Sequence, residues 1–408
     1  MRLGEIASRL KIAISDDGRD CGRERNCCMR YEKVCIEAFG YHLPEEVVSS
    51  DELESRLEPL YSRLRLPQGR LELMSGIRQR RFWPRDMLPS QASVTSAERA
   101  IAASGVDRRE IGALIHGSVC RDFVEPATAS GVHHRLGLSA DCIVYDVSNA
   151  CLGVLNGMVQ IANMIELGQI RAGVVAGTES ARSLVETTIA ELNSNTTLTR
   201  DQVKLAIASL TIGSASVAVV LTHRDLSRTE NRLLCATSRA ETRHHGLCQS
   251  TRDASVGGRT EPLMTTDSER LLQEGVRAAV PAFDQFLDET GWSRDELHKT
   301  FCHQVGVAHR RLMFESLGLN PAIDFSTLDF LGNTGSAALP ITAAIGIERG
   351  HLQRDDHVGL LGIGSGINVL MLGVDWQRSL VAPENKARRP FGAKLGSTPT
   401  EPPLVHGS

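Results

Sequence analysis

The sequence predicts an α/β protein made of two similar halves, in which helices cover parallel or mixed β-sheets. Strand and helix patterns alternate along most of the chain, and this alternation is typical of sheets covered by helices. The chain also repeats itself at an offset of roughly 180 residues, a period that suits a duplicated domain better than a solenoid. Its 408 residues, 41% of them apolar, are enough to form two sizeable cores.

The repeat is visible in the pairing of similar segments. "RREIGALIHGSV" resembles "RDELHKTFCHQV", so that His116 corresponds to His303, and "RAGVVAGTES" resembles "HVGLLGIGSG". The same offset places the loop of Asn333 opposite the loop of Cys151. Two similar halves that pack against each other bring equivalent loops together near their shared axis. We therefore expect one site built from both halves.

The first third of the chain carries clear element signals. "YEKVCIEAFG" alternates like a strand, and "SSDELESRLEPLYSRL" begins with Ser49 and Glu52, which form a capping box at the start of a helix. "SVTSAERAIAASGV" predicts a helix that ends near Gly105, and "IGALIHGSV" predicts a short buried strand. "TASGVHHRLGL" then predicts another helix that ends at a glycine.

A single cysteine stands where the next helix is expected to begin. The strand "CIVYDVS" leads into "NACLGVLNGM", where apolar residues recur at helical spacing directly behind Cys151. Backbone N–H groups and the positive end of the helix dipole favour a thiolate at such a position, which makes Cys151 a candidate nucleophile. The alternative is a small buried apolar side chain, as most free cysteines are.

His303 and Asn333 are the second-half candidates. His303 follows an apolar strand fragment, and Asn333 lies in the glycine-flanked loop "FLGNTGSAALP". Each taken alone has an ordinary structural explanation, a satisfied core histidine or a turn asparagine. With Cys151 they supply a nucleophile and two hydrogen-bond donors for a thioester oxyanion, which is the grouping that acyl transfer needs. "GIGSG" precedes a strand rather than a helix, so it predicts a tight turn near the site and not a dinucleotide loop.

Breaks in the pattern suggest the domain organisation. We expect residues 1–28 to be a disordered extension and the proline-rich residues 379–408 to be a disordered tail. Residues 29–225 form the N-terminal half with the nucleophile, and residues 226–378 form the C-terminal half. Residues 182–210 have no counterpart in the second half and carry two amphipathic helical patterns, so they predict a cap over a pocket.

Composition excludes several function classes. The net charge is −4 and basic residues are interleaved with acidic ones, which argues against a nucleic-acid partner. The sequence contains no apolar run long enough for a membrane span and no pattern typical of a secretory signal, so we expect a cytoplasmic protein. The ten cysteines form no CxxC pair, which supports neither disulfides nor a metal site.

Three blocks of the sequence resemble a known family. "DVSNACLG", "HQVG" and "GNTGSAALP" look like the catalytic blocks of the thiolase superfamily, in the 3-oxoacyl-acyl-carrier-protein synthase III branch. The resemblance implies a five-layer αβαβα fold and a homodimer. It implies that Cys151 accepts the acyl group and that His303 and Asn333 bind the second substrate's carbonyl. It also implies an oxyanion hole made of the backbone N–H groups of Cys151 and Ser365.

A further segment narrows the resemblance. "SVCRDFVEPATAS" is similar to a segment of the long-chain-olefin-pathway thiolases, which condense two fatty acyl-CoA molecules head to head. Their glutamate matches Glu125, and in that branch it reaches into the partner subunit's site and removes the α-proton of the second acyl thioester. The implied product is a 2-alkyl-3-oxoacyl-CoA. Coenzyme A is then a substrate carrier, and neither a metal nor a redox cofactor is implied.

Other interpretations stay open at this point. Arg78, Arg80 and Arg81 of "GIRQRR" are candidates for binding the coenzyme phosphates, although surface charge explains them as well. The main alternative function is a decarboxylating 3-oxoacyl synthase III that uses malonyl-carrier protein in fatty acid or polyketide synthesis. An acyltransferase that makes an ester or amide and a non-enzymatic scaffold are the remaining alternatives.

Overall fold

We describe residues 28–250 and 263–382 in a computed structural model of the chain. Most of the two segments expected to be disordered, residues 1–27 and 383–408, lies outside the described residues. Both segments were predicted too long, because residues at the inner end of each belong to strands. Cys28 belongs to strand β1 (Cys28–Arg30), which pairs with β9, and Val381–Ala382 form strand β16, which pairs with β2. Backbone hydrogen bonds join these two short strands to the sheet. The sequence pattern does not reveal this pairing.

The two halves of the sheet have the same strand order and the same orientations. In the N-terminal half the order is β6-β5-β7-β8-β2, and in the C-terminal half it is β13-β12-β14-β15-β9. In each half the first three strands are parallel neighbours and the last two join antiparallel. A short antiparallel contact between β2 and β9, at Cys35 and Arg232, connects the halves. This topology confirms the predicted duplication.

Three of these strands, β2, β5 and β6, overlap the segments that the sequence predicted as strands. In the N-terminal half they are β2 Val34–His42, β5 Ile111–Gly117, β6 Ile143–Val147, β7 Ala172–Glu179 and β8 Ala215–His223. In the C-terminal half they are β9 Arg232–Ala240, β12 Lys299–Cys302, β13 Asp324–Phe325, β14 Asp356–Gly364 and β15 Asn368–Trp376.

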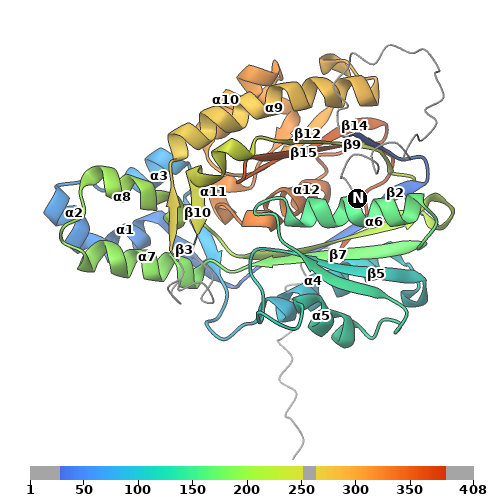
Figure 1. Ribbon diagram of the computed structural model, residues 1–408, viewed down its shortest axis with the longest axis horizontal. Helices are drawn as coiled ribbons and strands as arrows, with labels where there is room; N and C mark the ends of the chain where they lie inside the picture. The colour runs from blue at the N-terminus through green and yellow to red at the C-terminus, as the bar shows by residue number, and fades with distance from the viewer. Residues whose placement is uncertain (1–27, 251–262, 383–408) are drawn as a thin grey trace, which may run out of the picture.

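The helices form three layers around the two halves of the sheet, which gives five layers in all (Figure 1). α6 (Gly153–Glu166) and α12 (Ala338–Glu348) lie between the halves, and α12 is buried along its whole length except at its last residue. Such an all-apolar helix needs protein on every side. α4 (Pro89–Ser104) and α5 (Thr128–Leu136) cover one outer face, and α9 (Ser268–Thr290) and α10 (Val307–Leu317) cover the other. The predicted five-layer architecture is confirmed.

Helix ends follow local sequence signals. The Ser49 hydroxyl accepts a hydrogen bond from the Glu52 N–H at 3.0 Å and caps α1 (Ser50–Arg56). The helix expected over the whole segment is interrupted at Leu57, and α2 (Glu58–Leu64) begins there with a proline in its first turn. α4 ends at Gly105, whose φ of 68° requires the left-handed conformation that glycine adopts freely.

A smaller unit lies at one end of the molecule. It contains α3 (Arg70–Ser75), the hairpin β3 (Glu46–Ser49) and β4 (Gln79–Phe82), α7 (Arg182–Ser194), α8 (Arg200–Ala206), the strand pair β10 (Cys248–Ser250) and β11 (Met264–Thr266), and the single turn α11 (Leu328–Leu331). Residues 182–210 thus form two helices, which share an apolar cluster with α1 and α2.

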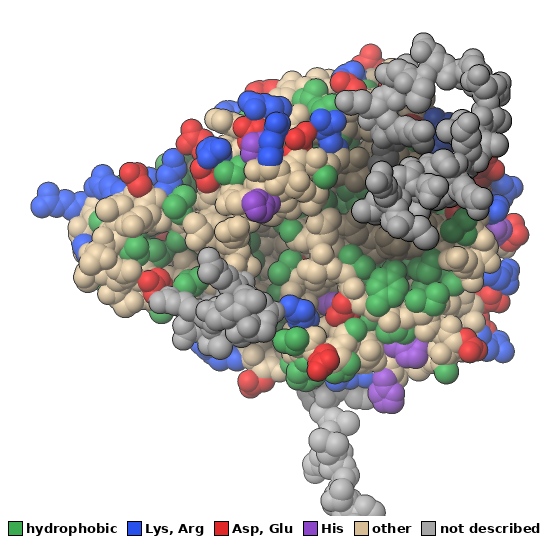
Figure 2. All heavy atoms as spheres, viewed as in Figure 1, with side chains coloured by type: hydrophobic (Ala, Val, Ile, Leu, Met, Phe, Trp, Pro, Cys, Tyr) green, Lys and Arg blue, Asp and Glu red, His purple; other side chains and the backbone are tan. Residues whose placement is uncertain are grey.

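None of the described helices is both long and apolar enough to span a membrane. On the face shown in Figure 2, basic and acidic side chains are interspersed.

Two glycine substitutions test how tightly the outer helix packs on the sheet. A Cβ on Gly40 in β2 would lie 2.3 Å from the Ala100 nitrogen and 2.4 Å from the Ser96 oxygen, both backbone atoms of α4. We expect Gly40→Ala to destabilise the protein by about 3 kcal/mol, because the helix has to move away from the sheet. Urea denaturation measures this change. Gly131→Ala in α5 is the matched control, since its Cβ meets Ser90 at an ordinary 3.7 Å, and it should instead stabilise by up to about 1 kcal/mol.

Candidate active site

A cavity of about 740 Å³ brings together the three predicted residues Cys151, His303 and Asn333. Cys151 comes from the N-terminal half and the other two from the C-terminal half, as the repeat predicted. Apolar side chains make up much of the remaining wall: Leu184, Ile212, Met264, Leu271, Leu272, Val276, Met313, Ile363 and Ile367. The cavity is therefore a mostly apolar space that meets a few polar groups, which is typical of a small-molecule site.

Cys151 lies just before the N-terminus of α6. Leu152 is the N-cap residue, so that the cysteine precedes the first helical turn by two residues. Backbone N–H groups of Ser365 and of Cys151 itself interact with the thiol and favour the thiolate. Burial acts in the opposite direction and is larger, with nearby Cys248 and Glu179 adding to it, and it raises the pKa of Cys151 to about 12. The thiol is the favoured form at neutral pH, which corrects the thiolate expected from the helix end alone.

The turn that supplies Ser365 is built as the sequence predicted. It joins the antiparallel strands β14 and β15, so "GIGSG" leads into a strand and not into a helix. A Cβ on Gly364 would lie 3.5 Å from the backbone nitrogen of Cys151, which shows how closely the turn approaches the nucleophile. Two N–H groups, from Cys151 and Ser365, thus point at one sulfur atom.

His303 is a neutral imidazole at the cavity wall. Burial, with a smaller contribution from His309, lowers the pKa of His303 to about 4. Within the described part of the chain its buried Nδ1 has no hydrogen-bond partner. The equivalent residue in the first half, His116, is also buried, but it bonds to the Ser93 hydroxyl at 3.1 Å and does not line the cavity. Both halves thus have a histidine at the equivalent position, and of the two it is His303 that lines the cavity.

Asn333 is held by three hydrogen bonds from two loops. Its backbone N–H donates to the Thr211 carbonyl at 2.9 Å, and its own carbonyl accepts from the Gly213 N–H at 2.8 Å. Its Oδ1 accepts from the Gly335 N–H at 3.0 Å. Since the amide oxygen is used in this way, the NH₂ group is the part of the side chain that can donate to a ligand.

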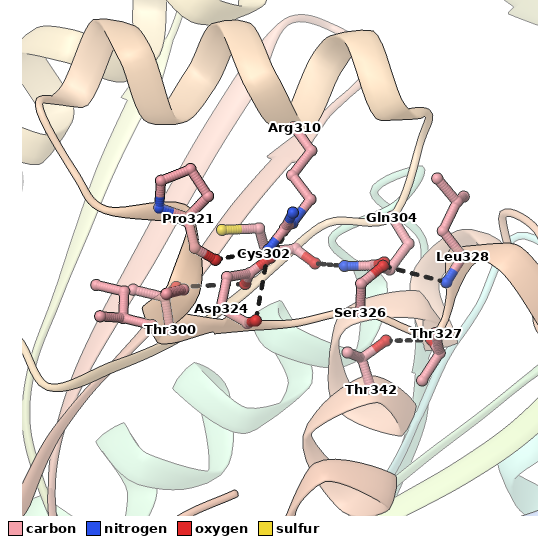
Figure 3. A network of polar contacts seen from close by, with 12 residues as sticks. Thr300, Cys302, Gln304, Arg310, Pro321, Asp324, Ser326, Thr327, Leu328 and Thr342 are labelled. Carbon is pink, nitrogen blue, oxygen red and sulfur yellow. Dashed lines mark hydrogen bonds and ion pairs between the residues drawn. The ribbon is translucent and has the colours of Figure 1, made fainter. Parts of the chain in front are cut away.

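A polar network fixes the strand and helix on either side of His303 (Figure 3). Gln304 donates to the Cys302 carbonyl at 2.7 Å and accepts from the Ser326 hydroxyl at 2.7 Å. Arg310 on α10 donates to Asp324 on β13 at 2.6 Å. Burial raises the pKa of Asp324 to about 6, although Arg310 acts in the other direction. The network therefore orients the β12–α10 connection that carries His303.

Glu179 is the main site residue that the sequence reasoning missed. It ends β7, lines the cavity and is only 5% exposed. Its Oε1 accepts hydrogen bonds from the Val119 N–H at 3.1 Å, the Ser336 N–H at 3.2 Å and the Ser336 hydroxyl at 2.5 Å. A charged residue at the carboxyl end of a buried strand was the signal available in the sequence. Cys120, Cys248 and His309 also line the cavity and were not singled out as site residues.

Glu125 lies outside the cavity of its own chain. It is exposed in the loop between β5 and α5, beside Phe123, which is 57% exposed, and Val124, which is 81% exposed. The structure of one chain therefore does not bring Glu125 to the cavity that holds Cys151.

The three candidate arginines are not among the cavity residues. Arg80 is fully buried and donates to the Ser50 hydroxyl at 3.1 Å, and burial lowers its pKa to about 10. The structure thus contradicts a phosphate-binding role for Arg80, because its guanidinium is enclosed by protein. Arg81 donates to the Pro44 carbonyl at 2.7 Å, whereas Arg78 is largely exposed and lies 3.5 Å from Asp329. In the described ranges, no three His, Cys, Asp or Glu side chains are grouped so that they could hold a metal ion.

Two family models match the chain. The thiolase N-terminal domain matches residues 78–232, and the C-terminal domain of 3-oxoacyl-[acyl-carrier-protein] synthase III matches residues 287–376. The fold and the cavity therefore define an acyltransferase of the thiolase superfamily, similar to synthase III. This finding confirms the resemblance of the three sequence blocks.

Individual relatives define the branch. The chain is 43% identical over 351 residues to the acyl-CoA:acyl-CoA alkyltransferase of Shewanella oneidensis, across 85% of this chain and 100% of that protein. The same-named protein of Xanthomonas campestris is 33% identical over 348 residues, across 85% and 100% of the two chains. The chain belongs to the acyl-CoA:acyl-CoA alkyltransferase family. The β-ketoacyl-[acyl-carrier-protein] synthase III of Pseudomonas aeruginosa is more distant, at 24% identity over 348 residues, 85% of this chain and 96% of that protein.

Solved structures agree with this assignment. Cerulenin-bound OleA of Xanthomonas campestris has a TM-score of 0.80 at 33% identity, across 85% of this chain and 98% of that chain. A variant of the same protein with bound lauric acid and lauroyl-CoA has a TM-score of 0.79 at 32% identity, across 85% and 100%.

We predict that Glu179→Gln makes Cys151 more reactive toward iodoacetamide. The glutamine oxygen can still accept the three hydrogen bonds, but the negative charge that helps to raise the pKa of Cys151 is gone. The thiolate fraction at mildly alkaline pH should rise several-fold, and the pH profile of alkylation should move to lower pH. Peptide mass spectrometry measures the rate. The exposed Glu72→Gln should leave the profile unchanged, and an unchanged profile in Glu179→Gln would contradict the electrostatic effect.

We predict that the stability loss in Arg310→Met depends on pH. A carboxyl whose folded pKa is above its unfolded value binds its proton more tightly when folded, so stability falls as pH rises between the two values. Without Arg310 the pKa of Asp324 rises further above about 6, so the loss relative to wild type should be small below about pH 5, reach about 1 kcal/mol near pH 7 and increase at higher pH. Urea denaturation at several pH values measures it. The neighbouring Arg311→Met, whose side chain is 78% exposed, should cost less than about 0.5 kcal/mol at every pH.

Proposed function

We propose that this protein condenses two long-chain fatty acyl-CoA molecules head to head to a 2-alkyl-3-oxoacyl-CoA and free coenzyme A. One observation carries the proposal: a large apolar cavity joins Cys151 to His303 and Asn333 in a chain that is 43% identical to an acyl-CoA:acyl-CoA alkyltransferase over that relative's full length. OleA, whose structure is similar, has been solved with lauroyl-CoA. An apolar wall suits fatty chains, and the polar groups suit a thioester.

The first step is acyl transfer to the enzyme. The Cys151 sulfur attacks the thioester carbon of the first acyl-CoA, the carbon–sulfur bond to coenzyme A breaks, and coenzyme A leaves with the proton that Cys151 gives up. The N–H groups of Cys151 and Ser365, which point at the sulfur, are suited to hold the negative oxygen that develops beside it. This role as an oxyanion hole is part of the proposal.

The second step forms the carbon–carbon bond. His303 and the Asn333 amide donate hydrogen bonds to the carbonyl of the second acyl-CoA, which stabilises its enolate once the α-proton is removed. The enolate carbon attacks the acyl-enzyme carbon, the bond to Cys151 breaks, and the sulfur regains a proton. Neither step transfers electrons to an acceptor, so the proposal includes no redox cofactor, and it includes no metal. Coenzyme A acts as the substrate carrier.

Glu125 is the proposed base for the α-proton, supplied by the other subunit of a homodimer. Its exposure outside its own cavity fits a residue that acts in a partner. The exposed Phe123 and Val124 beside it would be covered by that partner. Arg78, which is exposed, remains the proposed contact for the coenzyme phosphates, since Arg80 is enclosed. A cytoplasmic location remains a prediction from the sequence.

The alternative, a decarboxylating synthase III, is not favoured, because the named synthase III is only 24% identical to this chain. The two functions differ in one requirement. Loss of CO₂ from malonyl-carrier protein creates a carbanion without a base, whereas condensation of two acyl-CoA molecules needs one.

The test supplies myristoyl-CoA alone to purified protein and measures free-thiol release, with products identified by mass spectrometry. Wild type should release one coenzyme A for acylation and form a two-chain β-keto product. Cys151→Ala should form neither, and Glu125→Ala should still acylate Cys151 but lose at least about a hundredfold in condensation rate.

A requirement for malonyl-carrier protein before any carbon–carbon bond forms would establish the decarboxylating alternative. The exposed Glu72→Gln is the control for surface charge and should behave as wild type.

A further inference from the structure

A glycine in the middle of a long helix faces the cavity. Gly275 lies in α9 and lines the cavity with Leu271 and Leu272, which share its side of the helix four and three residues earlier, and with Val276, which follows Leu272 at i+4 spacing. Glycine inside a helix costs up to about 1 kcal/mol relative to alanine. A glycine at this position therefore calls for a physical reason.

Close packing is not that reason. A Cβ built on Gly275 would have one neighbouring atom within 4 Å, the Cγ2 of Ile363 at 3.6 Å, which is an ordinary contact. Other glycines differ: a Cβ on Gly157 in α6 would lie 2.5 Å from Val175, and one on Gly346 in α12 would lie 2.6 Å from Phe301. Those two glycines let elements approach, whereas Gly275 leaves space open.

The open space is next to the nucleophile. Ile363, which faces Gly275, lies near the end of β14, and the following two residues are the ones that approach Cys151. Gly364 lies against the Cys151 backbone nitrogen, and the Ser365 N–H interacts with its sulfur. An acyl chain attached to Cys151 that enters this part of the cavity would lie along the wall that α9 and the end of β14 form together. Met313 and Ile367 continue the apolar wall there.

We propose that Gly275 sets the length of the acyl chain that the Cys151 cavity accepts, because a glycine at this point of the wall leaves the cavity beside Leu271, Leu272 and Ile363 unfilled. The inference rests on the proposed acyl transfer to Cys151 and adds its specificity. A methyl group at position 275 fits at ordinary contact distance. A branched or longer side chain would extend past the Ile363 methyl group into the cavity and leave room for short chains only.

The test measures acylation of Cys151 by intact-protein mass spectrometry with octanoyl-, lauroyl- and palmitoyl-CoA. Wild type and Gly275→Ala should accept all three. Gly275→Leu should keep octanoyl transfer within about twofold and lose at least about tenfold in the palmitoyl rate, since even one methylene that a pocket cannot hold costs about that much. Gln273→Leu, on the exposed side of the same helix, is the matched control and should equal wild type.

A double variant distinguishes a filled cavity from a disturbed fold. Ile363→Ala in the Gly275→Leu background removes bulk from the opposite wall, so the palmitoyl rate should recover by at least about tenfold. Thermal unfolding should show Gly275→Leu folded. A palmitoyl rate in Gly275→Leu within about twofold of wild type, or a loss that is equal for all three chains, would overturn the inference. Absence of acylation of wild type by every acyl-CoA would instead overturn the proposed function.

Discussion

The hydrogen bonds between Glu179 and Ser336 join the two halves of the protein at the active site. Glu179 ends a strand of the first half, and Ser336 follows the Asn333 loop of the second. The same carboxylate oxygen also accepts from Val119, in the loop that leads to Glu125. Since a buried carboxylate must keep its hydrogen-bond partners, these loops are tied to one point. The Val119 loop and the segment that follows Asn333 are therefore held together at the wall of the cavity.

Burial favours the uncharged forms of the ionisable side chains at the site. Cys151 is favoured as a thiol and His303 as a neutral imidazole, because both lie where the charged forms lose hydration. In such surroundings a hydrogen-bond donor that points at the reacting atoms stabilises developing charge more strongly than it would in water. The backbone groups at Cys151 and Ser365 and the amide of Asn333 therefore suit charge that develops only during the reaction. As a consequence, the Cys151 thiol must lose its proton as it reacts.

The apolar part of the cavity and the polar part are built by different elements. Loops at the ends of strands supply the polar groups, and the face of α9 with β14 supplies much of the apolar wall. Because of this division, a change at a single wall residue such as Gly275 can alter the length of acyl chain that fits without moving the polar groups. The two halves contribute unequally, because loops of both halves supply the polar groups whereas α9 and β14 of the second half supply this apolar wall.

Most of the elements, the duplication and the three residues Cys151, His303 and Asn333 could be predicted from the sequence, since periodicity, caps and repeated segments can be read directly from the chain. It also indicated the turn at Ser365. The protonation of Cys151, the burial of Arg80 and the hydrogen bonds of Glu179 to Val119 and Ser336 became visible only in the folded chain. Each of these depends on which distant segments cover a side chain. Burial then outweighs the local effect of a helix end on Cys151, and no local pattern reports how much water a side chain loses.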